Sequence, residues 1–384
     1  MTRKQVVLIE WVILLLLLAA LVIGGVFFML SRIGSGRKTD SAAAKKQTEA
    51  AAQKSALVAE PESETETEPE TQQAAEQKSS YTFSFAGDCT IGSLLEWQGS
   101  LAVDFQSVVG ENYAYPLSGV KDIFDKDDLT VVNLEGTFTD SSNAVVKPYR
   151  FKADPKYVQV LKEGSVEAVS TANNHSGDFQ DEGRQDTIAA LDSVGILHTG
   201  AGAPLIRELD GGLRVGIVSY NTVDNPVGEY EWRSSVQADI TSCREADCDL
   251  IIGFMHWGSV EYLKEPEAWE VQFAHDMADW GCDLIVGGHA HILQRMEYYN
   301  DVPIFYSMGN FCYGGNTNPD DKDSVIVQVQ YSWDGTVRSV ERSDMRVIPC
   351  EVSTRSDLND YCPTPCRADS EDYRRILEKL EWES

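Results

Sequence analysis

The sequence predicts an α/β protein, and three observations lead to that fold class. Short apolar runs rich in β-branched residues alternate with segments of helical spacing, as in strands and helices layered around a sheet. Hydrophobic residues make up 42% and aromatic residues 9% of the 384 residues, so the chain can bury a substantial core. After Val302 the pattern changes to strands in succession, which predicts a mixed sheet.

The alternating region supplies the first strands and helices. Predicted strands cover residues 81–86, 129–134, 166–172, 214–220, 249–255 and 283–286. Residues 181–194 and 266–280 have helical spacing between them, and in the second helix Pro266 suits the first turn and Gly281 the C-cap.

The last part of the chain is predicted to hold a hairpin and a short helix. Residues 333–336 (Trp-Asp-Gly-Thr) are typical of a hairpin turn. Residues 351–384 form a C-terminal extension with a helix over 371–382, for which Ser370 is the expected N-cap.

The N-terminus is predicted to be a membrane anchor. Residues 11–30 are 20 consecutive residues without a charge, the length that a transmembrane helix needs. A cleaved signal peptide is the rival interpretation, because Arg3 and Lys4 form a basic start, but the run is longer than a typical signal core and no clear cleavage site follows at once. We therefore expect residues 1–31 to be an uncleaved anchor in membrane lipid.

Residues 32–80 are predicted to be a disordered linker. Ser, Ala, Gln, Thr and Glu dominate this stretch, and such a composition cannot bury enough apolar surface to offset chain entropy. More basic residues follow the apolar run than precede it, so the positive-inside rule alone would put the folded part in the cytoplasm.

The net charge of −29 argues against a nucleic-acid-binding protein, because affinity for nucleic acid comes largely from Lys and Arg on phosphates. Residues 1–80 hold 10 acidic and 9 basic side chains, so their net charge is −1 and residues 81–384 carry −28. The acidity therefore belongs to the folded domain, where it would repel a polyanionic substrate unless metal ions or local cations such as Lys147, Arg150 and Lys152 offset it.

Residues of metal-ligand type follow most of the predicted strands. The strand ends run into Gly87-Asp88, Asn133-Leu134-Glu135, Asn173-Asn174-His175, His256-Trp257-Gly258 and Gly288-His289-Ala290-His291. Functional sites in layered α/β folds collect at the carboxyl ends of strands. A mixture of carboxylates, Asn and His suits a divalent metal such as Zn, Mn or Fe, whereas His198 and His275 stand outside these motifs and are expected to be structural.

These motifs, in this order, together with residues 307–311 (Ser-Met-Gly-Asn-Phe), resemble the CapA family over residues 81–345. That family comprises capsule or poly-γ-glutamate synthesis proteins within the calcineurin-like metallophosphatase superfamily. The resemblance implies a four-layer α/β/β/α sandwich for the domain at 81–350.

The resemblance also implies roles for individual residues. Asp88 and His291 would bind one metal ion, and Asn174, His256 and His289 a second, with Glu135 as the bridging carboxylate. His175 would act as the acid on a leaving group, with Asp88 as the other catalytic residue. Asn133, Asn173 and Asn310 would bind substrate.

Some residues depart from the family pattern. Thr90 stands where many metallophosphatases have a His, so the first metal would have one protein ligand fewer. The number of bound ions, one or two, is therefore left open. Two residues, Ser259 and Val260, separate the His-Trp-Gly motif from Glu261, one more than expected. Gln180 and Ala290 replace a frequent Gly and Pro.

The eight cysteines are expected to include disulfides of an exported domain. Cys243 with Cys248, and Cys350 with Cys362 or Cys366, are the pairs considered. Two further cysteines, Cys89 and Cys312, lie in motif loops and are expected near each other.

The expected function is that of a single-pass membrane protein with an extracellular metal-dependent hydrolase domain, in capsule or poly-γ-glutamate-type polymer synthesis. Its substrate would be an anionic cell-surface polymer cleaved at γ-glutamyl amide bonds, or a phosphoester, and capsule-export proteins would be partners. The alternative is a non-catalytic factor that binds, exports or anchors polymer with the same fold.

Overall fold

The computed structural model describes residues 80–382 except residue 201 and residues 224–228. The predicted membrane anchor and nearly all of the predicted linker lie outside the described residues. Within the described part of the chain, no helix is long and apolar enough to cross a bilayer.

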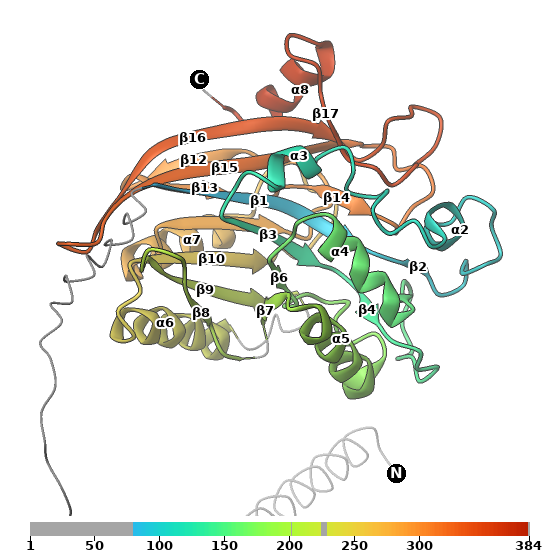
Figure 1. Ribbon diagram of the computed structural model, residues 1–384, viewed down its shortest axis with the longest axis horizontal. Coiled ribbons are helices and arrows are strands. Elements are labelled where there is room, and N and C mark those ends of the chain that lie inside the picture. Colours follow the sequence, from blue (N-terminus) through green and yellow to red (C-terminus); the bar gives the residue numbers. More distant parts are fainter. Residues whose placement is uncertain (1–79, 201, 224–228, 383–384) are drawn as a thin grey trace, which may run out of the picture. The chain divides into compact units, whose positions relative to one another are not determined.

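The first sheet is mixed and is built around β1 (Figure 1). Its strand order is β17-β16-β15-β1-β3-β6-β7, and β14 also pairs with β1. The strands β3, β6 and β7 run parallel to β1, whereas β15 runs antiparallel to β1 and β16 runs antiparallel to β15. The bounds are β1 Ser80–Thr90, β3 Leu129–Leu134, β6 Ala168–Ser170, β7 Leu197–Thr199, β14 Asn310–Tyr313, β15 Asp323–Asp334, β16 Ser339–Glu351 and β17 Thr364–Pro365.

The second sheet has the order β12-β13-β11-β10-β9-β8. Its four inner strands are parallel, and the two edge strands are antiparallel to their neighbours. The bounds are β8 Leu205–Glu208, β9 Arg214–Asn221, β10 Leu250–His256, β11 Leu284–Gly288, β12 Met296–Tyr299 and β13 Val302–Phe305. A small third sheet joins β2 (Ser93–Leu94), β5 (Phe151–Ala153) and β4 (Thr137–Phe138).

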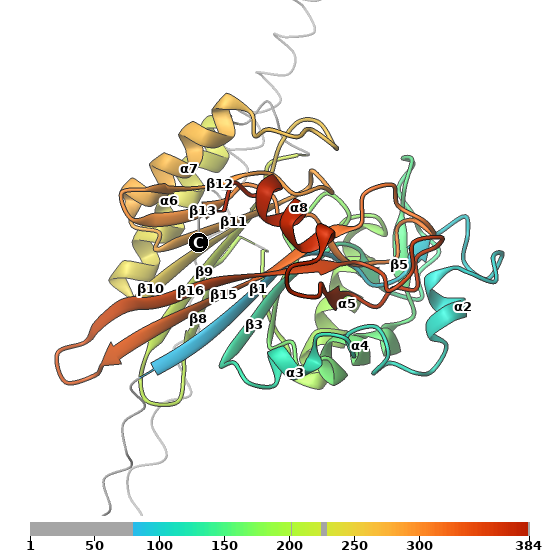
Figure 2. The ribbon, with the colours of Figure 1, turned by 90° about the horizontal axis from the view of Figure 1, so that it is seen from above.

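Three hydrophobic cores establish the layers. One core lies between the sheets, where Phe83 and Val131 of the first sheet pack with Ile217 and Ile252 of the second. Because side chains alternate along a strand, the residues between them point outward to helices. Figure 2 shows α6 and α7 on one flank of the strands and α4 and α5 on the other, so the predicted α/β/β/α order is confirmed.

The helices that cover the sheets differ in how well the sequence predicted them. The helices are α2 Phe105–Val109, α3 Lys121–Phe124, a 3-10 turn at Pro155–Val158, α4 Gln159–Glu163, α5 Gln180–Val194, α6 Glu229–Glu245, α7 Ala268–Trp280 and α8 Glu371–Lys379. Gly281 ends α7 in the left-handed region, as predicted, but Pro266 is not in its first turn, because Glu267 is the N-cap. Helix α6 was not predicted.

The C-terminal extension is part of the folded core. Ser370 caps α8 by accepting a hydrogen bond from the Tyr373 amide, as predicted, although the helix ends at Lys379 instead of 382. Ile376 and Leu380 are fully buried in the core between the sheets. Arg375 and Lys379 form ion pairs with the buried Asp323 at the start of β15.

The expected disulfides are not formed in the structure, where all eight cysteines are free thiols. Cys243 and Cys248 are hydrogen-bonded to each other, so the structure confirms their proximity but not the bond. The Cys89 thiol contacts the Cys312 backbone, which confirms that these two cysteines are neighbours. Burial raises the pKa of Cys89 to about 12, so its thiol stays protonated and unreactive at neutral pH.

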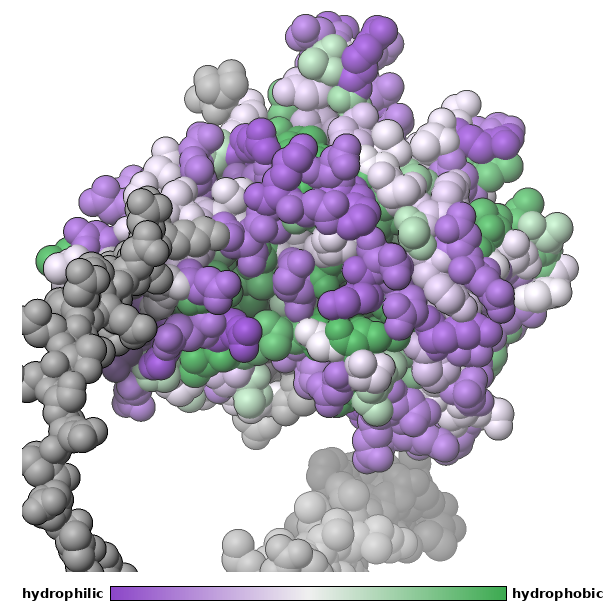
Figure 3. All heavy atoms as spheres, in the orientation of Figure 1, coloured by the Kyte–Doolittle hydropathy of each residue, from purple (hydrophilic) through white to green (hydrophobic). Residues whose placement is uncertain are grey.

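One face of the folded domain can be followed in Figure 3. On the face shown in Figure 3, hydrophilic residues predominate and hydrophobic residues are scattered between them. This pattern agrees with the charge of −28 that residues 81–384 carry.

Candidate metal centre

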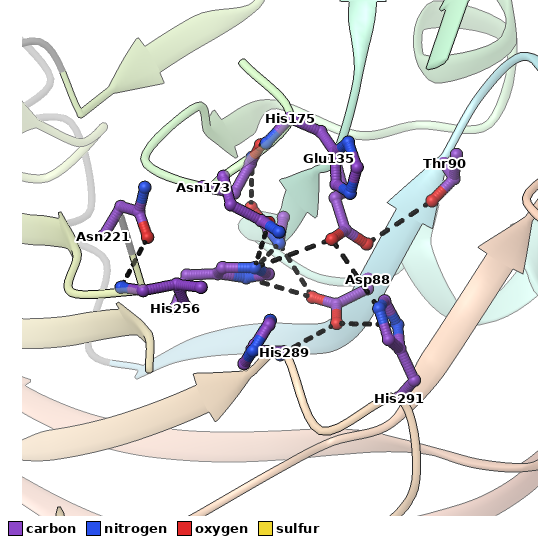
Figure 4. Close-up of polar contacts among 12 residues, drawn as sticks. Asp88, Thr90, Glu135, Asn173, His175, Asn221, His256, His289 and His291 are labelled. Carbon is purple, nitrogen blue, oxygen red and sulfur yellow. Dashed lines mark hydrogen bonds and ion pairs between the residues drawn. The ribbon is translucent and has the colours of Figure 1, made fainter. Parts of the chain in front are cut away.

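The predicted site residues meet where strands of both sheets end. Asp88 on β1 pairs in register with Asn133 on β3, and Glu135 directly follows β3. In the second sheet, His256 ends β10 in register with Gly288, which ends β11 and leads into His289. Figure 4 shows Asp88 in the middle of these side chains, with Glu135, His256 and His291 around it.

Glycines bring the two sheets into contact at this point. A Cβ atom on Gly288 would lie 2.5 Å from a carboxylate oxygen of Asp88, and one on Gly87 would lie 2.0 Å from the Gly309 carbonyl oxygen. A side chain would therefore displace the Asp88 carboxylate at the first position and the Gly309 backbone at the second. The two histidines after Gly288 have φ angles of 91° (His289) and 57° (His291), which non-glycine residues rarely adopt and which are found preferentially at functional sites.

Asp88 is fully buried and is held by two hydrogen bonds. Its Oδ1 accepts from Asn133 Nδ2 at 2.7 Å, and its Oδ2 accepts from the His289 amide at 3.0 Å. Asn133 Nδ2 also lies 3.1 Å from His256 Nδ1. One amide group therefore fixes a carboxylate of the first sheet against an imidazole of the second.

Glu135 is the buried carboxylate that faces both predicted metal positions. Its Oε1 lies 3.5 Å from His256 Nε2 and 3.9 Å from His291 Nε2, and it has no hydrogen-bond partner. Burial raises the pKa of Glu135, the charge of His291 lowers it, and the net shift is upward. Thr90 contacts only the other oxygen, at 3.5 Å, so it does not replace the missing ligand.

His291 is oriented by Asn310. The Asn310 Oδ1 atom lies 2.9 Å from His291 Nδ1, and Asn310 Nδ2 donates to the His291 carbonyl oxygen at 3.0 Å. The amide oxygen can only accept, so Nδ1 carries the proton and Nε2 keeps its lone pair for a metal. Burial lowers the pKa of His291, but the charges of Glu135 and Asp88 outweigh it and the net shift is upward.

The remaining two histidines are neutral at physiological pH, as metal ligands must be. Burial, reinforced by the neighbouring histidines, lowers the pKa of His256 well below its usual value and that of His289 to about 4. His256 Nε2 lies 2.9 Å from Asn174 Oδ1. His289 Nδ1 is buried without a partner.

His175 stands beside this cluster in a chain of polar contacts. Its Nδ1 lies 2.9 Å from Oδ2 of the fully buried Asp178, and Lys147 Nζ lies 2.6 Å from the other oxygen of Asp178. The same Asp178 oxygen that contacts His175 accepts from the Phe151 amide at 2.7 Å. The carboxylate can only accept, so His175 Nδ1 donates to Asp178, and Nε2 is the ring nitrogen left to exchange a proton with substrate.

The donor set fits a divalent metal. Asp88, Glu135 and His291 each offer a ligand atom, and these atoms all lie within 4.8 Å of one another. Two buried atoms, Glu135 Oε1 and His289 Nδ1, form no hydrogen bond within residues 80–382 as described, and a bound metal would offset the desolvation cost that this leaves. Asn174 and His256 meet next to Glu135, where the second ion was predicted.

The predicted substrate-binding amides lie inside the site. Asn133 donates to Asp88, and Asn173 Nδ2 donates to Asn133 Oδ1 and to the Leu134 carbonyl. Together with Asn310, they position the ligand residues, and their contact with substrate stays a prediction. Of the predicted cations, Lys147 and Arg150 are paired with Asp178 and Glu96, so they add little free positive charge.

Comparison with known proteins identifies relatives. Residues 82–314 match the family described as "Bacterial capsule synthesis protein PGA_cap". The PGA biosynthesis protein CapA of Bacillus subtilis (strain 168) is 27% identical over 318 residues, which cover 78% of each chain. The capsule biosynthesis protein CapA of Bacillus anthracis is 29% identical over 208 residues, 50% of each chain. A probable polyglutamine synthesis accessory protein of Mycobacterium tuberculosis is 32% identical over 211 residues, 48% of this chain and 55% of the relative.

Similar solved structures include the calcineurin-like phosphoesterase YfkN from Bacillus subtilis, which is 14% identical in sequence and has a TM-score of 0.44. The match covers 78% of this chain and 96% of that chain. A phosphatase from Mycoplasma pneumoniae has 16% identity and a TM-score of 0.43, covering 70% and 93%. These scores are too low to support a statement about activity. The family match, by contrast, spans more than half of the chain and includes every predicted site residue from Asp88 to Asn310, so the protein belongs to the bacterial capsule synthesis family PGA_cap, as the CapA-like motifs predicted.

Proposed function

We propose that this protein is a metal-dependent hydrolase that acts on an anionic polymer during capsule or poly-γ-glutamate-type synthesis. One observation carries the proposal: Asp88, Glu135 and His291 offer buried ligand atoms within 4.8 Å of one another, and Glu135 Oε1 has no hydrogen-bond partner among the described residues. A site that only stabilised the fold would pair that oxygen.

The chemistry follows from the two halves of the site. A divalent ion held by Asp88, Glu135 and His291 would lower the pKa of a bound water and neutralise charge that develops on the attacked group. His175, whose Nδ1 donates to Asp178, would as the imidazolium supply a proton from Nε2 to the leaving group and would then be neutral. The buried amides of Asn133 and Asn310 hold the ligand side chains so that little reorganisation is needed.

The names of the relatives suggest the substrate class. CapA of Bacillus subtilis is named for PGA biosynthesis, and the Mycobacterium tuberculosis relative for polyglutamine synthesis. A γ-glutamyl amide bond is the substrate we propose, and a phosphoester is the alternative for the same metal chemistry.

The domain would act outside the cell. Residues 11–30 would anchor the chain in the membrane, and export proteins of the capsule machinery would be its partners. A Ser80→Cys variant, in cells whose native thiols are blocked first, should react with an impermeant thiol reagent. Protection until the cells are lysed would place the domain in the cytoplasm, as the basic residues after the apolar run would suggest.

A second candidate function is a metal-containing polymer-binding factor without catalysis. Thr90 favours it, because this residue stands at a predicted ligand position and only contacts Glu135 at 3.5 Å. Turnover separates the two functions. The purified full-length protein, loaded with Mn, Zn or Fe, should release products from γ-linked glutamate oligomers or from phosphoesters, and Asp88→Asn should abolish the release. Binding of polymer without any product would support the second candidate.

A further inference from the structure

Next to the metal centre lies a polar pocket of about 250 Å³ that the chemistry described so far does not use. Its lining comes from the loops after β6 and β7, the end of β9 and the N-terminal half of α5, and it includes Asn173, Ser176, Arg184, Ser219 and Asn221. At about 30 Å³ per water, this volume holds about eight waters, enough for a side chain with a charged end.

The charged side chain among the described residues that line the pocket is a cation, Arg184. None of the described residues that line it is Asp or Glu, whereas Arg184 contributes a guanidinium. Arg184 is half exposed and has one ion pair, in which Nη1 lies 3.0 Å from the exposed Asp181. Its other N–H groups are suited to bind a carboxylate with two parallel hydrogen bonds.

A second observation points to a ligand. Ser219 is 5% exposed and lines the pocket, and its hydroxyl has no hydrogen-bond partner in the part of the chain that the structure describes. A buried hydroxyl without a partner costs stability, so its presence at a pocket wall is explained when a bound polar group pairs with it.

The pocket is linked to the reacting groups by two short paths. Asn173 accepts a hydrogen bond from the His175 amide at 3.1 Å, and Asn221 pairs in register with His256. Arg184 lies against Gly177, two residues after His175, because a Cβ atom on Gly177 would be 2.4 Å from Arg184 Nη2. A group bound by Arg184 is thus attached to the loop that carries the predicted proton donor.

We infer that this pocket binds a free carboxylate of the substrate, next to the bond that is cleaved, with Arg184 as its cation and Ser219 as a further donor. The inference rests on the proposed function and adds a determinant of specificity to it. A γ-linked glutamate polymer carries one free carboxylate per residue, whereas a simple phosphoester has none to offer this pocket.

The test compares two ligands and three variants of the full-length protein. Labelled γ-linked glutamate oligomers, and the same oligomers with their carboxylates converted to primary amides, are titrated and binding is followed by fluorescence anisotropy. Arg184→Gln should weaken binding of the carboxylate oligomer about tenfold or more and leave the amide oligomer nearly unchanged. Arg207→Gln is the matched control, because Arg207 lies on β8, is exposed and does not line the pocket.

Ser219→Ala should weaken binding of the carboxylate oligomer without lowering the free energy of unfolding, since the hydroxyl has no partner to lose. Three outcomes would each overturn the assignment. Arg184→Gln and Arg207→Gln could weaken binding equally, Arg184→Gln could lower the affinity for both oligomers equally, or the wild type could fail to bind the carboxylate oligomer. Metal content and turnover are measured on the same samples. They test the proposed function independently of the carboxylate assignment.

Discussion

At the scale of single residues, the site depends on amides that hold other side chains in place. Asn310 is 3% exposed, and its side-chain amide contacts His291 twice, once at the ring and once at the backbone. This double contact fixes the tautomer and the ring direction of a proposed ligand whose backbone is in a rarely populated conformation.

Replacing Asn310 should therefore weaken metal binding without removing a ligand. We expect Asn310→Ala to lower metal affinity about 10- to 100-fold, because Nδ1 of His291 loses its acceptor. Competition with a chelating dye measures the affinity. Asn310→Asp should retain most of the affinity, and Asn143→Ala, at an exposed amide, serves as the control. Unchanged metal affinity in Asn310→Ala would show that the contacts of Asn310 with His291 are not needed for metal binding.

The sequence predicted the types of residue at the site better than their roles. The order of motifs was sufficient to name Asp88, Glu135 and His291, because strand ends of layered α/β folds converge. It did not reveal that the side-chain amide of Asn133 contacts both Asp88 and His256. The contact with His256 joins β3 to a strand that lies more than 100 residues later in the sequence. Arg184 carried no motif and became visible only with the pocket.

At the scale of elements, the strands were predicted well and the helices less so. Residues 129–134 form a strand with the predicted bounds because the run is apolar and β-branched throughout. Helix α6 was missed although Trp232, Val236 and Ile240 recur at intervals of four and are buried against the second sheet. The polar residues between them hid a spacing that predicts an amphipathic helix.

Helix α8 should contribute to stability out of proportion to its length. Ile376 is fully buried between the sheets, so Ile376→Ala should lower the free energy of unfolding by about 2–5 kcal/mol, as large-to-small core substitutions do. Denaturant unfolding measures the change. Glu378→Ala, at an exposed position of the same helix, should change it by less than about 0.5 kcal/mol. If both substitutions change the free energy of unfolding by the same small amount, α8 does not belong to the core.

A half-buried carboxylate pair, Asp127 and Glu167, lies at the opposite end of β3 and gives a pH-dependent stability. Asp127 and Glu167 both accept hydrogen bonds from Thr130, and burial raises the pKa of Glu167 to about 7 and that of Asp127 to about 6. Because these values exceed those of the unfolded chain, the folded state binds more protons in this range. The stability that protonated Asp127 and Glu167 contribute to the fold is therefore present at lower pH and is lost as the pH rises through about 6–7.

Glu167→Gln should remove part of that dependence. We expect the variant to melt about 2 °C or more above the wild type at a pH of about 8, and to lose this advantage near a pH of about 5. Thermal unfolding at both pH values measures the difference. Glu163→Gln, at an exposed position, should show none. A constant difference at both pH values would mean that the Glu167 proton is not involved.

At the scale of the whole molecule, the net charge of −29 sets a condition on the substrate. Repulsion between the acidic domain and a polyanion falls as salt screens it, so kcat/KM for a carboxylate oligomer should rise between about 20 and 150 mM salt. Rates with the amide oligomer should hardly change. A fall in kcat/KM with salt would instead indicate a basic binding surface and contradict this account.

The most direct test of the metal centre is elemental analysis of the purified full-length protein after loading with Mn, Zn or Fe and removal of excess ion. The wild type and His198→Ala, whose histidine is partly exposed on the surface, should retain at least one equivalent of metal. The Asp88→Asn, His291→Ala double variant should remain folded and lose it. A wild type that retains no metal, or a double variant that retains as much as the wild type, would contradict the assignment of this site.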